Sequence, residues 1–82
     1  MYYLYIIKCR DKTLYTGITV NLKRRLGEHN GSRLGAKYTL ARRPVKLVYS
    51  KKFRNRSLAS KAESRIKKLP RKEKLKLIQT AN

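Results

Sequence analysis

Residues 2–19 read YYLYIIKCRDKTLYTGIT and contain two β-strand patterns separated by a short polar segment. Aromatic and β-branched residues recur over residues 2–9 and again over 12–19, and such residues favour strands. The Arg-Asp-Lys segment at 10–12 lies between them. The pattern therefore predicts a β-hairpin.

The length of the hairpin loop decides which tyrosines share a face of the sheet. A symmetric two-residue turn would place Tyr15 opposite Lys8, and Tyr5 and Tyr15 would then point to opposite faces. A three-residue loop or a bulge shifts the pairing by one residue and puts both phenols on one face. A site shared by the two tyrosines requires the second arrangement.

The rest of the chain predicts helices with one more strand between them. Asn21 can cap a first helix, because its amide oxygen can accept from unpaired N–H groups of the first turn. The elements expected after the hairpin are a helix over 21–29, a basic loop over 31–44 with a short helical turn, a strand over 45–50, a helix beginning at Asn55 or Ser57, and a short final helix opened by Pro70. This β-β-α-β-α-α order predicts one domain over 1–82, an α/β fold of the α+β type with a small, three-stranded, mainly antiparallel sheet flanked by helices.

Charge is the most unusual property of the composition. The 82 residues include 23 Lys and Arg against 4 Asp and Glu, a formal net charge of +19. Self-repulsion at this charge destabilises the compact monomer, and a polyanionic partner offsets it. We therefore expect nucleic acid as the partner, with an acidic membrane surface as the weaker alternative because no helix pattern sets a wide apolar face against a basic one.

The sequence also excludes some classes of protein and site. No apolar run approaches the ~18 residues that cross a bilayer. Cys9 is the single cysteine, so no intramolecular disulfide can form, and a zinc site could draw only on Cys9 and His29. We expect a cytoplasmic protein with no membrane partner.

Arg25 is placed where a charged residue needs a specific partner. It shares one face of the first predicted helix with Leu22 and Leu26, the face that should meet the sheet. A guanidinium directed at a sheet must reach a carboxylate, a phosphate or the rim. The alternative is an aliphatic stem that packs while the charged group reaches water.

Glu63 differs from the other three carboxylates, which have ordinary surface explanations. Glu28, for example, is expected to pair with Arg24 on the exposed side of the first helix. Glu63 instead borders the buried face of its helix, so it is the best-placed metal ligand of the four. The alternative role for Glu63 is an i,i+4 ion pair with Lys67.

Gly17 interrupts the second predicted strand, on the face that also carries Tyr15. Glycine weakens a strand, and inside one it often marks the close approach of a ligand or of another backbone. Tyr3 and Tyr5 share one face of the first strand. The plainer alternative for these tyrosines is a core position with one satisfied hydroxyl.

Several motifs of the chain, in this order and spacing, resemble the GIY-YIG nuclease domain, and in particular its short stand-alone bacterial branch. The matching segments are Tyr3-Leu4-Tyr5, Tyr15-Thr16-Gly17, Asn21-Leu22-Lys23-Arg24-Arg25-Leu26 with His29, Gly35-Ala36-Lys37-Tyr38-Thr39, Arg42-Arg43-Pro44, and Glu63 in Ala59-Ser60-Lys61-Ala62-Glu63. The resemblance covers essentially the whole chain. Its first triplet carries Tyr3 where the family pattern has glycine.

The resemblance implies a metal-dependent endonuclease that hydrolyses DNA phosphodiester bonds. It assigns Tyr5 and Tyr15 as the motif tyrosines, Arg25 as the phosphate-binding arginine and Glu63 as the sole protein ligand of one Mg²⁺ or Mn²⁺ ion. His29 matches a histidine frequent in part of the family and completes the expected catalytic group. Tyr15 is the expected general base toward the attacking water.

The remaining expectations concern substrate and partners. The residues expected to contact substrate are Tyr3, Gly17, Lys37, Arg42 and Arg43. DNA is favoured over RNA, and a second protein that supplies substrate selection is a further expectation. The alternative function is a non-catalytic nucleic-acid-binding module of the same fold, because a net charge of +19 suffices for binding without chemistry.

Overall fold

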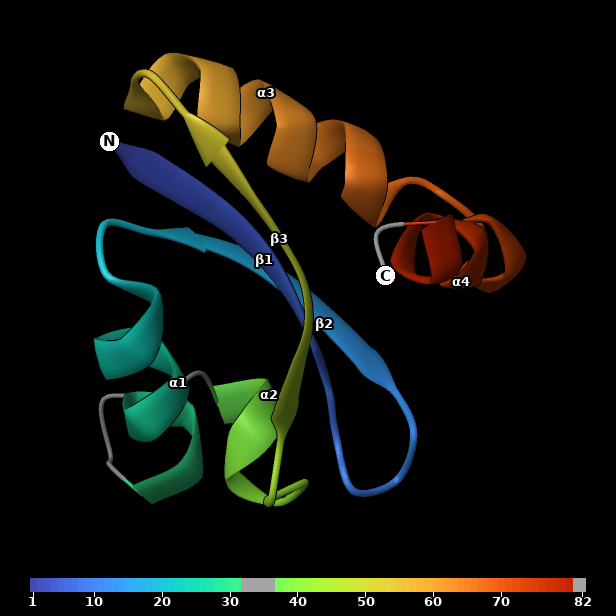
Figure 1. The fold of residues 1–82 in the computed structure, drawn as a ribbon. Helices are drawn as coiled ribbons and strands as arrows, with labels where there is room; N and C mark the ends of the chain where they lie inside the picture. The colour runs from blue at the N-terminus through green and yellow to red at the C-terminus, as the bar shows by residue number, and fades with distance from the viewer. Residues whose placement is uncertain (32–36, 81–82) are drawn as a thin grey trace.

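A computed structural model describes residues 1–31 and 37–80, and the elements follow the predicted order (Figure 1). They are β1 (Tyr2–Lys8), β2 (Leu14–Thr19), α1 (Leu22–Gly31), α2 (Lys37–Leu40), β3 (Lys46–Phe53), α3 (Arg56–Lys67) and α4 (Arg71–Thr80). The short α2 occupies the basic loop in which a helical turn was predicted. The fold class and the β-β-α-β-α-α order are therefore confirmed.

The three strands form one sheet in the order β2-β1-β3, and both pairs are antiparallel. β1 is the central strand and β2 forms one edge. α1 and α2 lie on one face of this sheet, and α3 covers the other, with α4 at its end (Figure 1). None of the helices in the described part of the chain has the length and apolar character needed to cross a membrane.

The hairpin closes through a three-residue loop, which resolves the register left open by the sequence. The Lys12 N–H donates to the Cys9 carbonyl and the Cys9 N–H to the Thr13 carbonyl, both at 2.9 Å. Lys12 has φ 70°, the left-handed conformation that ends such a loop. The Asp11 carboxylate accepts from the Thr13 N–H at 3.1 Å and holds the turn.

This loop sets the pairing that a shared tyrosine site requires. Tyr5 lies opposite Gly17, and Ile7 lies opposite Tyr15. Side chains of directly opposed residues point to the same face, so Tyr5 and Tyr15 share the face covered by α1. Of the two registers, the structure has the one that permits a common site.

Two apolar clusters pack on the two faces of the sheet. Beneath α1 the buried residues are Tyr5, Ile7, Cys9 and Val45, with Leu22 and Leu26 against them. Beneath α3 they are Leu4, Ile6 and Ile66, joined by side chains of β3 and α4. The face of α1 that was predicted to meet the sheet does so.

One detail of β3 departs from the prediction. Alternation over 45–50 placed Val45 and Tyr49 on one face, but the β1–β3 register shifts between Ile6 and Ile7. The extra residue of this bulge reverses the alternation. Val45 therefore packs toward α1, whereas Tyr49 packs toward α3.

The predicted helix caps are present. The Asn21 side chain accepts from the Arg24 N–H at 3.0 Å, and Asn55, rather than Ser57, accepts from the Leu58 N–H at 3.0 Å. These bonds satisfy N–H groups that have no partner within the first turn of a helix. They place the starts of α1 and α3, the two helices that carry the charged site residues.

Candidate active site

The ring of Tyr5 lies across β2 at Gly17, toward the edge of the sheet. Tyr5 is 3% exposed, and a Cβ atom at Gly17 would lie 2.5 Å from its hydroxyl oxygen and 2.7 Å from Cζ. No real side chain tolerates such distances, so glycine is required for the ring to lie there. The close approach predicted at Gly17 is therefore to the Tyr5 ring, whereas we expected a contact with substrate.

His29 holds the Tyr5 hydroxyl from the side of α1. Its Nε2 lies 2.8 Å from that oxygen, and its Nδ1 lies 2.9 Å from the Thr39 Oγ1. The ring is fully buried, and burial, with help from the nearby Arg25 charge, lowers the pKa of His29 to about 4. The imidazole is therefore neutral at pH 7, with one nitrogen as donor and the other as acceptor.

Tyr15 packs on the same imidazole from β2. Its ring centroid lies 5.4 Å from that of His29, nearly edge-on at 63°, and the Tyr5 centroid lies 5.7 Å from it. Unlike Tyr5, Tyr15 is only half-buried. The two phenols therefore flank one buried histidine, and one of them keeps contact with solvent.

Arg25 pairs with a carboxylate and lies within electrostatic reach of a phenol. Its Nη1 lies 2.8 Å from the Glu28 Oε1, and its charge opposes the burial that raises the pKa of Tyr5. Its side chain remains 26% exposed. Of the partners predicted for a guanidinium at this position, a carboxylate is present and one side stays open to solvent.

The predicted Arg24–Glu28 ion pair is present, but Glu28 is not an exposed surface residue. We expected an exposed pair with Arg24, but the Glu28 side chain is only 19% exposed and lies closer to Arg25, with Arg24 Nε at 3.8 Å. The Arg25–Glu28 pair is the shorter of the two because Arg25 is on the face of α1 that turns toward the sheet, where the ion pair is shielded from water. Glu28 is therefore a site residue that the helical spacing pointed to but did not distinguish.

Glu63 approaches the same group of residues from α3. Its side chain is 23% exposed and lies 3.5 Å from Lys67 Nζ, so the predicted i,i+4 pair is present. Burial raises the pKa of Tyr5; Arg25 opposes this rise, and the charges of Tyr15 and Glu63 add to it. The carboxylate of Glu63 is thus within electrostatic reach of the Tyr5 phenol.

A comparison with known proteins accounts for this combination of residues. The family model of the GIY-YIG catalytic domain matches residues 1–76. The chain belongs to the GIY-YIG family. This is a nuclease family whose domains act on nucleic acid, as the sequence resemblance implied.

Bacterial proteins of similar length resemble this chain. A UPF0213 protein of Syntrophus aciditrophicus is 57% identical over 76 residues, which cover 93% of this chain and 87% of that protein. A UPF0213 protein of Oceanobacillus iheyensis is 55% identical over 78 residues, or 95% of this chain and 90% of that protein. The solution NMR structure of a UPF0213 protein from Bacillus halodurans has a TM-score of 0.63 at 38% identity, with 98% and 85% of the two chains covered. That of an E. faecalis protein has a TM-score of 0.65 at 47% identity, with 96% and 83% covered.

Two arginines predicted to contact substrate in this GIY-YIG chain are engaged within the fold. Arg42 Nε lies 3.0 Å from the Asp11 Oδ2 at the hairpin tip. Arg43 donates through Nε to the His29 carbonyl and through Nη2 to the Glu28 carbonyl at 3.1 Å. Arg43 thus satisfies carbonyls at the end of α1, which is a structural role where we predicted a phosphate contact.

The other expected substrate contacts lie at the margin of the GIY-YIG site. Tyr3 is half-buried on β1, opposite Thr19 and on the same face as Tyr5. The backbone of Lys37 begins α2, and its side chain lies outside the described part of the chain. Tyr3 therefore lies on the same face of the sheet as Tyr5 and Tyr15. The structure leaves the prediction for Lys37 untested.

Two polar residues of the GIY-YIG domain that sequence analysis missed connect α1 to α2 and to the residue before β3. Thr39 is fully buried and binds the His29 ring. Asn30 donates to the Val45 carbonyl at 3.0 Å and accepts from the Val45 N–H at 2.7 Å, as a neighbouring strand would. Asparagine near a helix end and threonine in a loop are common, so no signal in the sequence marked either one.

Proposed function

We propose that this GIY-YIG domain is a metal-dependent endonuclease that hydrolyses DNA phosphodiester bonds. The observation that carries the proposal is that Arg25, Tyr15 and Glu63 all stay partly exposed, and Tyr15 packs with the buried Tyr5 on one imidazole, that of His29. They come from three elements, and together they offer a phosphate-binding cation, a proton acceptor and a metal ligand at one edge of the sheet. The net charge of +19 supports binding to a polyanion.

The guanidinium and the two phenols have different parts in this proposal. Arg25, with 26% of its side chain exposed, binds the phosphoryl oxygens and stabilises the charge that develops on them. Tyr15 is half-buried, so water can reach its phenolic oxygen, and in its phenolate form it accepts the proton of the attacking water. Tyr5 is buried and bonded to His29, so it orients the site. We predicted His29 among the catalytic groups; its complete burial makes it a positioning residue for Tyr5.

Glu63 would hold one Mg²⁺ or Mn²⁺ ion. Within residues 1–31 and 37–80, no three His, Cys, Asp or Glu side chains gather into a metal site. A single carboxylate still suits Mg²⁺, which keeps several waters and takes further oxygens from a substrate phosphate. When bound, the ion polarises the phosphate and stabilises the leaving oxygen. The ammonium of Lys67 competes for the same carboxylate.

The test is cleavage of labelled flap, junction, hairpin and single-stranded DNA, with matched RNA strands, by the wild type and by Glu63→Gln. We expect metal-dependent cleavage of DNA by the wild type and none by Glu63→Gln, while the two bind DNA equally in EDTA. Glu73→Gln makes the same chemical change at a side chain that is 49% exposed on α4, and it should cut normally. Salt-sensitive binding without cleavage by the wild type would contradict the proposal and favour the non-catalytic binding module.

A further inference from the structure

A groove between β3, α3 and α4 lies apart from the nuclease site. It is an open cavity of about 360 Å³, and most of its lining is apolar. Its apolar floor includes Leu4, Tyr49, Ile66, Leu69 and Leu77. This volume is at the lower end of the range of about 300–1,000 Å³ that is typical of small-molecule sites in proteins.

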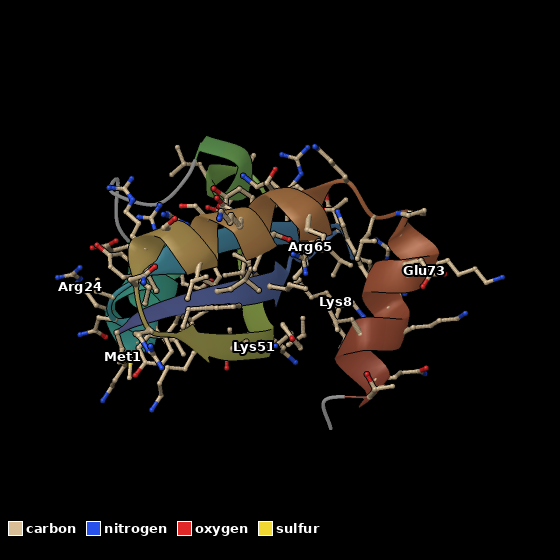
Figure 2. The ribbon with its side chains drawn as sticks, turned by 90° about the horizontal axis from the view of Figure 1, so that it is seen from above. Met1, Lys8, Arg24, Lys51, Arg65 and Glu73 are labelled. Carbon is tan, nitrogen blue, oxygen red and sulfur yellow. The ribbon has the colours of Figure 1, made fainter. Side chains whose placement is uncertain are left out.

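The rim of the groove is basic. Lys51, Lys61 and Arg65 line it, and none of its described lining residues carries a carboxylate. These three cations form no ion pair with residues of 1–31 or 37–80. In Figure 2, Arg65 lies near the end of α3 that leads to α4, and Lys51 lies along β3. The groove is therefore apolar at its floor and complementary to negative charge at its edge.

The position of the groove on α3 separates it from Glu63. Leu58, Ala62, Arg65 and Leu69 recur at helical spacing and face the groove. Glu63 lies on the other flank of α3, beyond the stripe that packs on the sheet. Leu58 is 45% exposed at the groove, so its side chain is open to a bound molecule. A molecule in the groove would leave the nuclease site open.

We propose that this groove binds an acidic amphipathic helix of a partner protein. Apolar side chains on one face of such a helix would fill the floor, and flanking carboxylates would pair with Lys51, Lys61 and Arg65. The partner is a protein rather than nucleic acid because the floor is mainly aliphatic, and Lys51 Nζ already lies over the Phe53 ring, 5.6 Å from its centroid. That ring face is thus covered by an ammonium group in this structure. A second copy of this chain is a poor occupant, since it carries the same charge of +19.

The test uses a designed peptide of about 15 residues with leucines at i, i+3, i+4 and i+7 and glutamates on its flanks. Its binding to the ¹⁵N-labelled protein is followed by NMR, without metal or DNA, beside a permuted peptide of the same composition. We expect shifts confined to residues around the groove and affinity at least tenfold above that of the permuted peptide. Equal binding of the two peptides, or shifts spread over the basic surface, would overturn the proposal.

Charge-matched variants separate the groove from the general attraction of a basic protein. Arg65→Glu, at the rim, should weaken binding of the designed peptide about tenfold more than Lys72→Glu, which makes a similar change at an exposed position outside the groove. Leu58→Ser should also weaken it without changing the charge. Equal effects of the two charge reversals contradict the proposal, as does a short single-stranded oligonucleotide that shifts the groove residues more than the peptide does. Because cleavage is not measured, these outcomes are independent of the proposed nuclease function.

Discussion

Replacing Gly17 by alanine tests the packing that brings Tyr5 into the site. The new Cβ would lie 2.5 Å from the Tyr5 Oη, 2.7 Å from Cζ and 3.1 Å from Cε2. Tyr5 is 3% exposed and held by His29, so its ring cannot swing freely away. Forcing extra atoms into a packed region costs about 1–3 kcal/mol. We therefore expect Gly17→Ala to lower the free energy of unfolding by that amount.

Gly27→Ala is the matched control for this substitution. No atom lies within 4 Å of a Cβ at Gly27, which is in the interior of α1. Alanine is favoured over glycine in a helix by about 1 kcal/mol, so this variant should be more stable than the wild type. The two substitutions are chemically identical but should change the free energy of unfolding in opposite directions.

Urea denaturation followed by circular dichroism measures both variants. In a domain of this size, each kcal/mol also shifts the thermal midpoint by about 4–8 °C. The destabilisation by Gly17→Ala should largely disappear in a Tyr5→Leu background, since leucine lacks the ring atoms that clash. Wild-type stability of Gly17→Ala, or equal cost in both backgrounds, would refute the proposed contact.

Three further predictions concern charge. The pKa of His29 is about 4 in the folded protein against 6.5 ordinarily, so between these pH values only the unfolded chain takes up this proton. The free energy of unfolding should therefore fall as the pH drops from 6.5 toward 4. His29→Gln should flatten that part of the stability curve, and an unchanged curve would contradict the burial argument. Glu28→Gln frees Arg25 of its carboxylate and should tighten DNA binding by about 1 kcal/mol, roughly fivefold, whereas Glu73→Gln should change it less. Affinity for DNA should decrease linearly on a log–log plot against salt, with a slope of about 0.9 per phosphate contacted, and a flat profile in a titration would exclude phosphate binding.

Much of the secondary structure is predictable from the sequence because its signals are local. Asn21 and Asn55 accept the N–H groups expected of helix caps, and Pro70 directly precedes α4. The hairpin register, by contrast, could not be predicted from local signals. It depends on Lys12 adopting a left-handed conformation, which lysine rarely does, so the sequence left two registers open.

The candidate site was predictable as a set of residues but not as a set of contacts. Arg25 stood out because a cation on an apolar face needs a partner, yet spacing could not decide whether Glu28 would pair with it or with Arg24. Contacts between residues that are distant in the sequence were harder still to predict. Thr39 meets His29 and Arg43 caps α1 only because α2 and the residues that follow it lie against α1, which no local pattern encodes.

Neighbouring arginines on α1 allow the sharpest comparison of the nuclease site with the basic surface around it. Arg25→Ala and Arg24→Ala remove the same charge one residue apart, from side chains that are 26% and 61% exposed. Single-turnover cleavage of labelled DNA at saturating protein measures the chemical step for each. We predict that Arg25→Ala slows cleavage by about 10²–10³-fold, as removal of a transition-state donor does, while Arg24→Ala stays within a few-fold of the wild type. Equal rates for the two variants would show that Arg25 is only one more surface cation.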